Sequence, residues 1–349
     1  MKRVSLSFAG LKIYFVDREK ALEKFIDWAE RGTYPVQVVF GPEGCGKSAL
    51  LRQAMELLKD HGYSVALISP LAGEEKERLS MTEDLKGLVE TSLSLLLGES
   101  VIKLVNVVVN LLYKVVKRGL SKRIALLLDD VFQAIGVDKA SLFVKSLLNI
   151  IEYPSVDYEK IVIVVTTSEG ITRREIGRHR WAELIPMWNM SKNGFKELYD
   201  MIPGDKPPFD EAWRCTGGNP EVLGRLYRAN WNVNRVTQHI VKGKRLIPFI
   251  SSLSNEEIKL LQRTLEDPDY LLKREVNDTL RKLKIQLMNR LVELNLIVDD
   301  LYTREQEFWI DTPPPEKDPE LGIGEYVAWQ TPLHREAVRI ALKNVEERL

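Results

Sequence analysis

The chain has 349 residues, of which 44% are hydrophobic and 29% are charged. These proportions are typical of folded globular proteins and exclude a fibrous or largely disordered chain. Lys and Arg together number 50, as do Asp and Glu, so the net charge predicts no general attraction to nucleic acid or acidic lipid.

The two cysteines, Cys45 and Cys215, are too few for a disulfide framework and are typical of a reducing compartment. The first residues are basic, but Lys12 and the charged run at 17–20 interrupt any apolar segment of signal-peptide length. We therefore expect a cytoplasmic protein.

Short apolar runs alternate with helical patterns from residue 36 to about residue 187. Runs that are apolar throughout are expected of parallel strands covered on both faces. The sequence therefore predicts a three-layer α/β domain over residues 1–188. The expected strands lie at 36–40, 64–69, 123–129, 161–166 and, more weakly, 182–185.

Residues 101–117 are strongly apolar, and their polar positions are three or four residues apart, which places them in one narrow stripe on a helix. A membrane span needs about 20 apolar residues and is destabilised by a central lysine. We expect a helix that is buried on most sides, and no stable membrane insertion. The polar positions are Lys103, Asn106, Asn110, Lys114 and Lys117.

Helical patterns without strands follow, at 191–202 and 220–241, separated by segments rich in Pro and Gly. They predict a helical lid domain over residues 189–245. The remainder, 246–349, begins with a capping box and has the order helix, helix, strand, loop, strand, which is typical of a winged-helix domain. Its expected features are the capping box Ser254 with Glu257, a helix at 274–294, strands at 297–298 and 325–329, and a proline-rich turn at 312–319.

The segment GPEGCGKS, residues 41–48, matches the phosphate-loop pattern GxxxxGK[ST] and lies between an apolar strand and a helix. Such a loop points backbone N–H groups at a phosphate, and the helix that follows adds the positive end of its dipole. Lys47 is expected to reach the outer phosphates and Ser48 to bind Mg²⁺. The predicted nucleotide contacts are Gly41, Pro42, Glu43, Gly44, Cys45, Gly46, Lys47, Ser48 and Ala49.

Two aspartates end the strand expected at 123–129. Asp129 is predicted to hold Mg²⁺ through water, and Asp130 to orient or deprotonate the attacking water. An Asp–Asp pair can also be a helix cap or a turn. The phosphate loop upstream favours the catalytic interpretation.

Weaker candidates follow the fourth apolar run, whose strand is expected between the phosphate-loop strand and the strand that ends at Asp129. Thr167, with Ser168 as second choice, could hydrogen-bond the γ-phosphate or the water; a strand-end turn is the alternative. Further on, Arg178 and Arg180 could neutralise γ-phosphate charge in cis or across a subunit boundary. A solvated basic loop is the alternative for these arginines.

Several segments together resemble the archaeal branch of the STAND ATPases, P-loop switch proteins related to AAA+ enzymes. They are FVDREKALEKF (15–25), GPEGCGKS (41–48), LLLDDVFQ (126–133), VVTTS (164–168) and TGGNPEVL (216–223). The resemblance extends over most of the chain, because a lid and a winged helix in this order are also family features. It implies that ATP and Mg²⁺ are bound, that residues 17–19 with Arg18 lie near the base and ribose, and that Pro220 presses on the adenine. Many relatives carry Glu where Asp130 stands.

The leading hypothesis is an ATP-binding, slowly hydrolysing switch, in which nucleotide between the α/β domain and the lid sets the position of the lid and winged helix. The winged helix could contact a protein partner or a second copy of the chain. A DNA-binding protein resembling archaeal replication initiators is the first alternative. A nucleotide-stabilised scaffold with little turnover is the second. The DNA hypothesis depends on the basic residues Arg274, Arg281, Lys282, Lys284 and Arg290.

Overall fold

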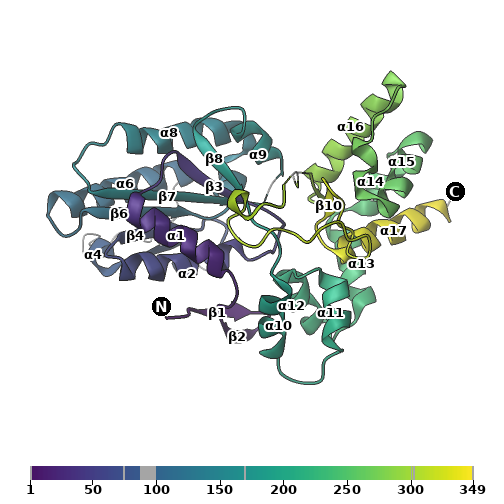
Figure 1. Cartoon of the computed structure of the whole chain (residues 1–349), viewed down its shortest axis with the longest axis horizontal. Helices are drawn as coiled ribbons and strands as arrows, with labels where there is room; N and C mark the ends of the chain where they lie inside the picture. The colour runs from purple at the N-terminus through teal and green to yellow at the C-terminus, as the bar shows by residue number, and fades with distance from the viewer. Residues whose placement is uncertain are drawn as a thin grey trace.

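We describe a computed structural model, which covers residues 2–73, 75–86, 100–168, 170–299, 301 and 303–347. An α/β domain, a group of lid helices and a group of C-terminal helices make up the molecule (Figure 1). The α/β domain lies at the left of the view, the lid below, and the C-terminal helices at the right.

The central sheet has the strand order β5-β4-β6-β7-β3-β8, and every pairing is parallel except that of β5 with β4. All residues of β3 and β4 are buried, as expected of strands covered on both faces. The predicted α/β class and its parallel strands are confirmed. The strands are β3 (Val36–Phe40), β4 (Ser64–Ile68), β5 (Leu79–Met81), β6 (Arg123–Leu128), β7 (Lys160–Thr167) and β8 (Ala182–Pro186).

Helices cover both faces of this sheet, and successive residues of each strand point to opposite faces. Leu126 and Leu128 belong to a hydrophobic cluster with α6, α7 and α8, whereas Ala125 and Leu127 belong to one with α1 and α2. The helices of this domain are α1 (Glu19–Arg31), α2 (Lys47–Asp60), α3 (Glu75–Arg78), α4 (Glu83–Lys86), α6 (Val101–Lys117), α7 (Val131–Ile135), a 3₁₀ turn η1 (Val137–Lys139), α8 (Ala140–Glu152) and α9 (Gly170–Ile176).

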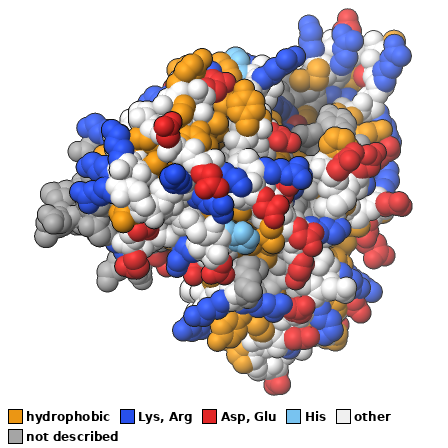
Figure 2. Space-filling model, turned by 60° about the vertical axis from the view of Figure 1, so that its left-hand side comes forward, with side chains coloured by type: hydrophobic (Ala, Val, Ile, Leu, Met, Phe, Trp, Pro, Cys, Tyr) orange, Lys and Arg blue, Asp and Glu red, His pale blue; other side chains and the backbone are white. Residues whose placement is uncertain are grey.

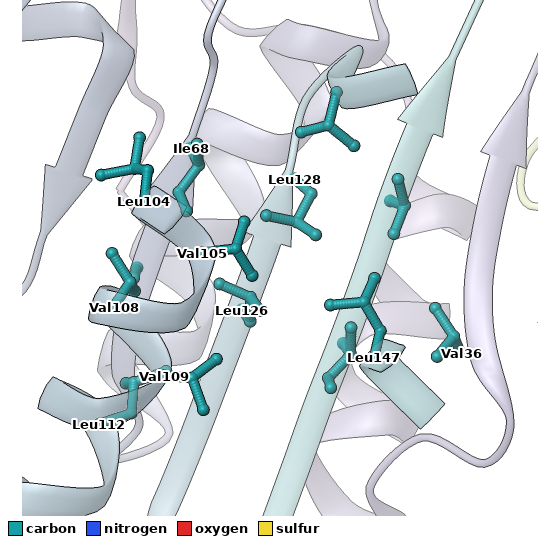
Figure 3. Close-up of a cluster of buried hydrophobic side chains, with 14 of the residues drawn as sticks. Val36, Ile68, Leu104, Val105, Val108, Val109, Leu112, Leu126, Leu128 and Leu147 are labelled. Carbon is teal, nitrogen blue, oxygen red and sulfur yellow. The ribbon is translucent and has the colours of Figure 1, made fainter. Parts of the chain in front are cut away.

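Helix α6 confirms the helix predicted at 101–117. Its apolar side chains, among them Val105, Val108 and Leu112, pack on the sheet beside Leu126 (Figure 3). All five predicted polar positions are exposed, so the stripe faces away from the sheet. None of the helices in the part of the chain that the structure describes has the length and hydrophobicity of a transmembrane span.

A hairpin of β1 (Ser5–Phe8) and β2 (Leu11–Tyr14) precedes the α/β domain and packs on the lid helices. Runs that are apolar throughout do not reveal it, because β1 alternates between exposed and half-buried residues. The predicted lid helices are present, with the segment 220–241 divided in two. The lid consists of α10 (Lys192–Asp200), α11 (Phe209–Thr216), α12 (Pro220–Arg228) and α13 (Val233–Gly243).

The C-terminal part contains the predicted capping box at Ser254 and Glu257 and the expected order of helices and short strands. One hydrophobic cluster extends from Val222 of the lid to Val345 near the C-terminus, so lid and C-terminal helices share a core. The domain limits after residues 188 and 245 stay predictions. The elements are α14 (Leu246–Ser251), α15 (Asn255–Glu266), η2 (Pro268–Leu272), α16 (Asp278–Glu293), β9 (Ile297–Val298), η3 (Gln306–Phe308), β10 (Ala328–Trp329) and α17 (Pro332–Glu346).

The long connection between β9 and β10 returns to the α/β domain (Figure 1). The Ile310 N–H donates to the carbonyl of Pro186 at the end of β8 (3.0 Å), and the Ile310 side chain joins the cluster around Phe25. The connection is therefore seated on the sheet edge, whereas a wing would project from its own domain.

The packing of α6 gives a stability prediction. Leu112→Ala removes a side chain that is 2% exposed, so the free energy of unfolding is expected to fall by about 2–5 kcal/mol. Asn110→Ala, on the exposed stripe of the same helix, is expected to change it by less than about 0.5 kcal/mol. Urea denaturation followed by circular dichroism measures both values. Equal effects of the two substitutions would contradict the packing described for α6.

Candidate nucleotide-binding site

The loop of residues 41–46 connects β3 to α2, and close neighbours leave no room for a side chain at two of its glycines. A methyl group at Gly41 would overlap with the carbonyl oxygen of Met187, and one at Gly44 would collide with Glu221 of the lid. Gly44 and Gly46 also have positive φ, at 75° and 106°, which disfavours any other residue. The loop is therefore tightly curved and closely enclosed.

Lys47 begins α2, and its side chain folds back into the curve of this loop. The ammonium group donates to the carbonyl oxygens of Gly41 (3.0 Å) and Pro42 (2.9 Å), and the residue is buried. The next residue, Ser48, donates its hydroxyl to Asp129 Oδ1 (3.1 Å). A cation, a hydroxyl and a carboxylate thus meet at the start of one helix.

The ends of β6 and β7 lie side by side and bring further polar groups to this point. Asp129 Oδ1 also accepts from the Thr166 hydroxyl (2.8 Å), and Asp130 Oδ1 accepts from the Ser168 N–H (3.0 Å) and hydroxyl (3.3 Å). Because side chains alternate along a strand, Thr166 and Ser168 share one face, and Thr167 lies on the other. The expected position of β7 between β6 and β3 is confirmed.

Asp130 has unusual backbone and electrostatic surroundings. Its φ is 47°, in the left-handed region, at the turn into α7. Burial and the neighbouring Asp129 carboxylate raise its pKa above the ordinary value for aspartate, and Lys47 and Ser168 offset only part of this effect. A carboxylate with a raised pKa is a stronger proton acceptor than a solvated aspartate.

A cavity of about 460 Å³ extends from this cluster to the lid and the N-terminal hairpin. It brings together most of the predicted contacts, namely Arg18, Glu43, Gly44, Cys45, Gly46, Lys47, Ser48, Ala49, Asp130 and Pro220. Gly41, Pro42, Asp129, Thr167, Arg178 and Arg180 are not among its lining residues. Gly41 and Pro42 contact the site through their carbonyl oxygens, which accept from Lys47, and Asp129 contacts it by accepting from the Ser48 hydroxyl.

The far end of the cavity is mostly apolar. Pro220 and Gly224 lie one turn apart on α12, and a methyl group at Gly224 would lie 3.3 Å from Ala9 Cβ and 3.4 Å from Phe8. The hairpin tip therefore touches the lid and closes this end. Ser168, the second choice from the sequence, also lines the cavity. The lining residues that the sequence did not reveal are Leu6, Ser7, Phe8, Ala9, Ile13, Tyr14, Phe15, Val16, Arg52, Met190, Leu198, Glu221, Gly224 and Arg228.

The predicted arginines lie in two different settings. Arg178 is 68% exposed and pairs with Glu175, and Arg180 is exposed, so neither is directed to the cavity in this structure. Arg18 lines the cavity, and its guanidinium donates to the Cys45 carbonyl of the loop (2.6 Å). It also pairs with Asp311 (2.9 Å).

Two other arginines of the basic segment at residues 172–180 connect α9 to the C-terminal helices. Arg173 and Arg174 both bind Asp299, and Arg174 Nη1 also donates to Asn289 Oδ1 of α16 (2.6 Å). Burial alone would raise the pKa of Asp299, but the two guanidinium groups hold it below its ordinary value. The end of β7 is thus linked through α9 to the C-terminal part.

A family model described as an ATPase domain predominantly from Archaea matches residues 15–226. The chain belongs to this archaeal ATPase family. The matched region includes the phosphate loop, the aspartate pair and the first turns of α12. A search of curated proteins finds no match.

Solved structures that resemble this archaeal ATPase include the ORC2 protein of Aeropyrum pernix in ADPNP–ADP complexes, with 10% identity, 93% and 94% of the two chains covered and a TM-score of 0.43. Cdc6p of Pyrobaculum aerophilum has 16% identity, 95% and 94% coverage and a TM-score of 0.39. The Aeropyrum pernix ORC1 protein in complex with DNA has 15% identity, 96% and 95% coverage and a TM-score of 0.36. These scores are too low to establish a shared fold.

The contacts of Asp130 in this ATPase give a testable prediction. Ser168→Ala removes a hydroxyl donor that stabilises the charged carboxylate, so the pKa of Asp130 is expected to rise further. Titration of ¹³C-labelled aspartate carboxyls by NMR measures the change. Ser146→Ala, whose hydroxyl donates to Phe143 in α8, is the control and should leave this pKa unchanged. A lowered or unchanged pKa in Ser168→Ala would be inconsistent with the geometry.

Proposed function

We propose that the chain is a cytoplasmic, ATP-binding and slowly hydrolysing switch, whose nucleotide state controls the position of the lid and the C-terminal helices. One observation carries the proposal: Lys47, Ser48, Asp130 and Ser168 meet at the polar end of a cavity whose other end is mostly apolar and lined by the hairpin and the lid. A purine nucleoside triphosphate has the same polarity, with the charged phosphates at one end and the aromatic base at the other.

The polar end suits phosphates and a magnesium ion. Lys47 and the loop amides would hold the outer phosphates, and Ser48 with Asp129 offers the hard oxygen donors that Mg²⁺ takes in phosphate sites. In the described ranges, no group of three or more His, Cys, Asp or Glu side chains could hold a metal ion, so tight binding would require the nucleotide as well. The ion would neutralise charge on the transferred phosphoryl group.

Asp130 is the residue that we assign to the attacking water. Its raised pKa makes it a competent acceptor, and Ser168 fixes the carboxylate from the end of the neighbouring strand. Aspartate is shorter than glutamate, which keeps the carboxylate farther from the γ-phosphate and favours slow turnover. A switch needs slow hydrolysis, because each nucleotide state must persist.

The contacts of Glu43 support the switch role. Its N–H donates to Gln330 Oε1 (2.9 Å), its carboxylate accepts from Lys244 (2.6 Å), and its carbonyl accepts from Asn219 (2.9 Å). The loop expected to bind phosphates is thus bonded to the lid and to the segment before α17. A ligand that reshapes the loop must alter these contacts.

The DNA alternative is less well supported by the structure. Lys284 is buried and pairs with Glu275 (3.3 Å), and Arg290 pairs with Glu257 (3.4 Å), so both cations already have internal partners. Arg281 pairs with its neighbour in α16, Asp278. Acidic and basic side chains are also intermixed over the face shown in Figure 2. We therefore favour the switch.

The roles of Lys47 and Asp130 are separable by experiment. Lys47→Ala is expected to abolish ATP binding, measured by calorimetry with Mg²⁺. Asp130→Asn is expected to retain binding and to lose about 10²–10⁴-fold in hydrolysis, measured by phosphate release. Lys117→Ala, on the exposed face of α6, is the charge-matched control. Wild-type hydrolysis in both site variants would contradict the proposal, and an absence of multiple turnovers in the wild type would favour the scaffold hypothesis.

The titration of Asp130 predicts a pH dependence. Only the deprotonated carboxylate can accept a proton, so kcat is expected to fall as the pH drops through the pKa of Asp130. Because burial raises this pKa, the fall should begin at a higher pH than for a solvated aspartate. A pH profile at saturating ATP measures it. A rate that stays constant down to the ordinary pKa of aspartate would exclude Asp130 as the base.

A further inference from the structure

The connection between β9 and β10 places one acidic side chain beside the nucleotide loop. Asp311 follows Ile310, whose N–H bonds to the end of β8, and the Asp311 carbonyl accepts from Gln306 (2.9 Å). In Figure 1 the short helix of this connection lies against the α/β domain, away from the C-terminal helices. Asp311 is therefore held in place by its own segment and by the sheet edge.

Asp311 forms a buried ion pair with Arg18. The Arg18 Nη1 lies 2.9 Å from Asp311 Oδ2, and both side chains are only 2% exposed. Desolvated charges of this kind are stable only as a pair with further hydrogen bonds. Arg18 supplies these bonds, since its other amino group donates to the Cys45 carbonyl (2.6 Å) and Nη1 also approaches the Asn189 carbonyl (3.4 Å).

The bond to Cys45 determines the direction of the next amide. In a planar trans peptide the carbonyl and the following N–H point in opposite directions. Arg18 holds the Cys45 carbonyl, and this fixes the direction in which the Gly46 N–H points. Gly46 lines the cavity next to Lys47, where the phosphates are expected. Without the guanidinium, Gly46 is free to rotate this peptide, because glycine accepts positive and negative φ alike.

We infer that Asp311 is a positioning residue of the nucleotide site: it holds Arg18, which orients the Cys45–Gly46 peptide toward the phosphates. This inference rests on the proposed function and extends it, because the site then includes a residue of the C-terminal part. The C-terminal connection thereby completes the phosphate loop in cis. Nucleotide affinity depends on whether this connection is docked.

The isosteric variant Asp311→Asn tests the inference in the full-length chain. Removing the carboxylate leaves Arg18 buried without its counter-charge, so affinity for Mg²⁺ with a non-hydrolysable ATP analogue is expected to fall by about tenfold or more. With ATP, KM should rise by a larger factor than kcat falls, because Asp130 and Ser168 stay in place. The control Glu307→Gln removes an exposed carboxylate from the same connection and should retain wild-type affinity.

A double-mutant cycle separates positioning from general stability. If Asp311 acts through Arg18, Asp311→Asn should not weaken binding further in an Arg18→Gln background. Additive losses of affinity in the double variant would overturn the inference, as would wild-type affinity in Asp311→Asn. In both cases binding by the wild type would leave the proposed function intact. Absence of binding by the wild type would overturn the proposed function and the inference together.

A conservative variant covers the case in which Asp311→Asn does not fold. Asp311→Glu keeps the charge but displaces the carboxylate, so it tests geometry alone. Lower affinity for the analogue, at unchanged thermal stability in the absence of nucleotide, is the expected result. Wild-type affinity in a folded Asp311→Glu protein would overturn the inference.

Discussion

The structure depends on the sharp turn of backbone between Gly41 and Gly46. Within the turn, the Lys47 ammonium donates to the carbonyls of Gly41 and Pro42, and the Cys45 N–H donates to Pro42. Distant parts of the chain add further support. Met187 lies close to Gly41, Glu221 lies close to Gly44, and Arg18 donates to the Cys45 carbonyl. The nucleotide loop is therefore a shared product of the sheet, the lid and the C-terminal part.

Much of the fold could be predicted from local patterns, because strands buried on both faces must be apolar throughout. The same patterns failed where the signal is short or depends on one residue of register. β5 has three residues, and the hairpin strands are only half-buried. At the end of β7 a shift of one position decides the face: Thr166 and Ser168 bond to the aspartates, and of these two the sequence named only Ser168, whereas the role of Thr167 stays a prediction.

Contacts between distant parts of the chain left no local signal. The sequence offered Arg178 and Arg180 as candidates for the γ-phosphate, with a solvated basic loop as the alternative, and gave no sign that Arg173 and Arg174 bind Asp299. The sequence predicts the proline-rich segment 312–319 as a turn of a winged helix and gives no sign that the connection containing it brings Asp311 to Arg18, 293 positions away in the chain. Pairing of buried charges is decided by tertiary packing, which composition and periodicity do not record.

The shared core of lid and C-terminal helices constrains how the proposed switch can move. Since Val222 and Val345 belong to one hydrophobic cluster, α12 cannot close on a ligand alone without exposing apolar surface. The motion that keeps this core intact is a rotation of the lid and the C-terminal helices together against the α/β domain. That motion must strain polar contacts between the two bodies, which include Glu43 with Lys244, Glu43 with Gln330 and Arg174 with Asn289. Polar groups that separate can bond to water instead, at a modest net cost in free energy, whereas apolar groups exposed by splitting the core cannot. Nucleotide binding can therefore act through these polar contacts.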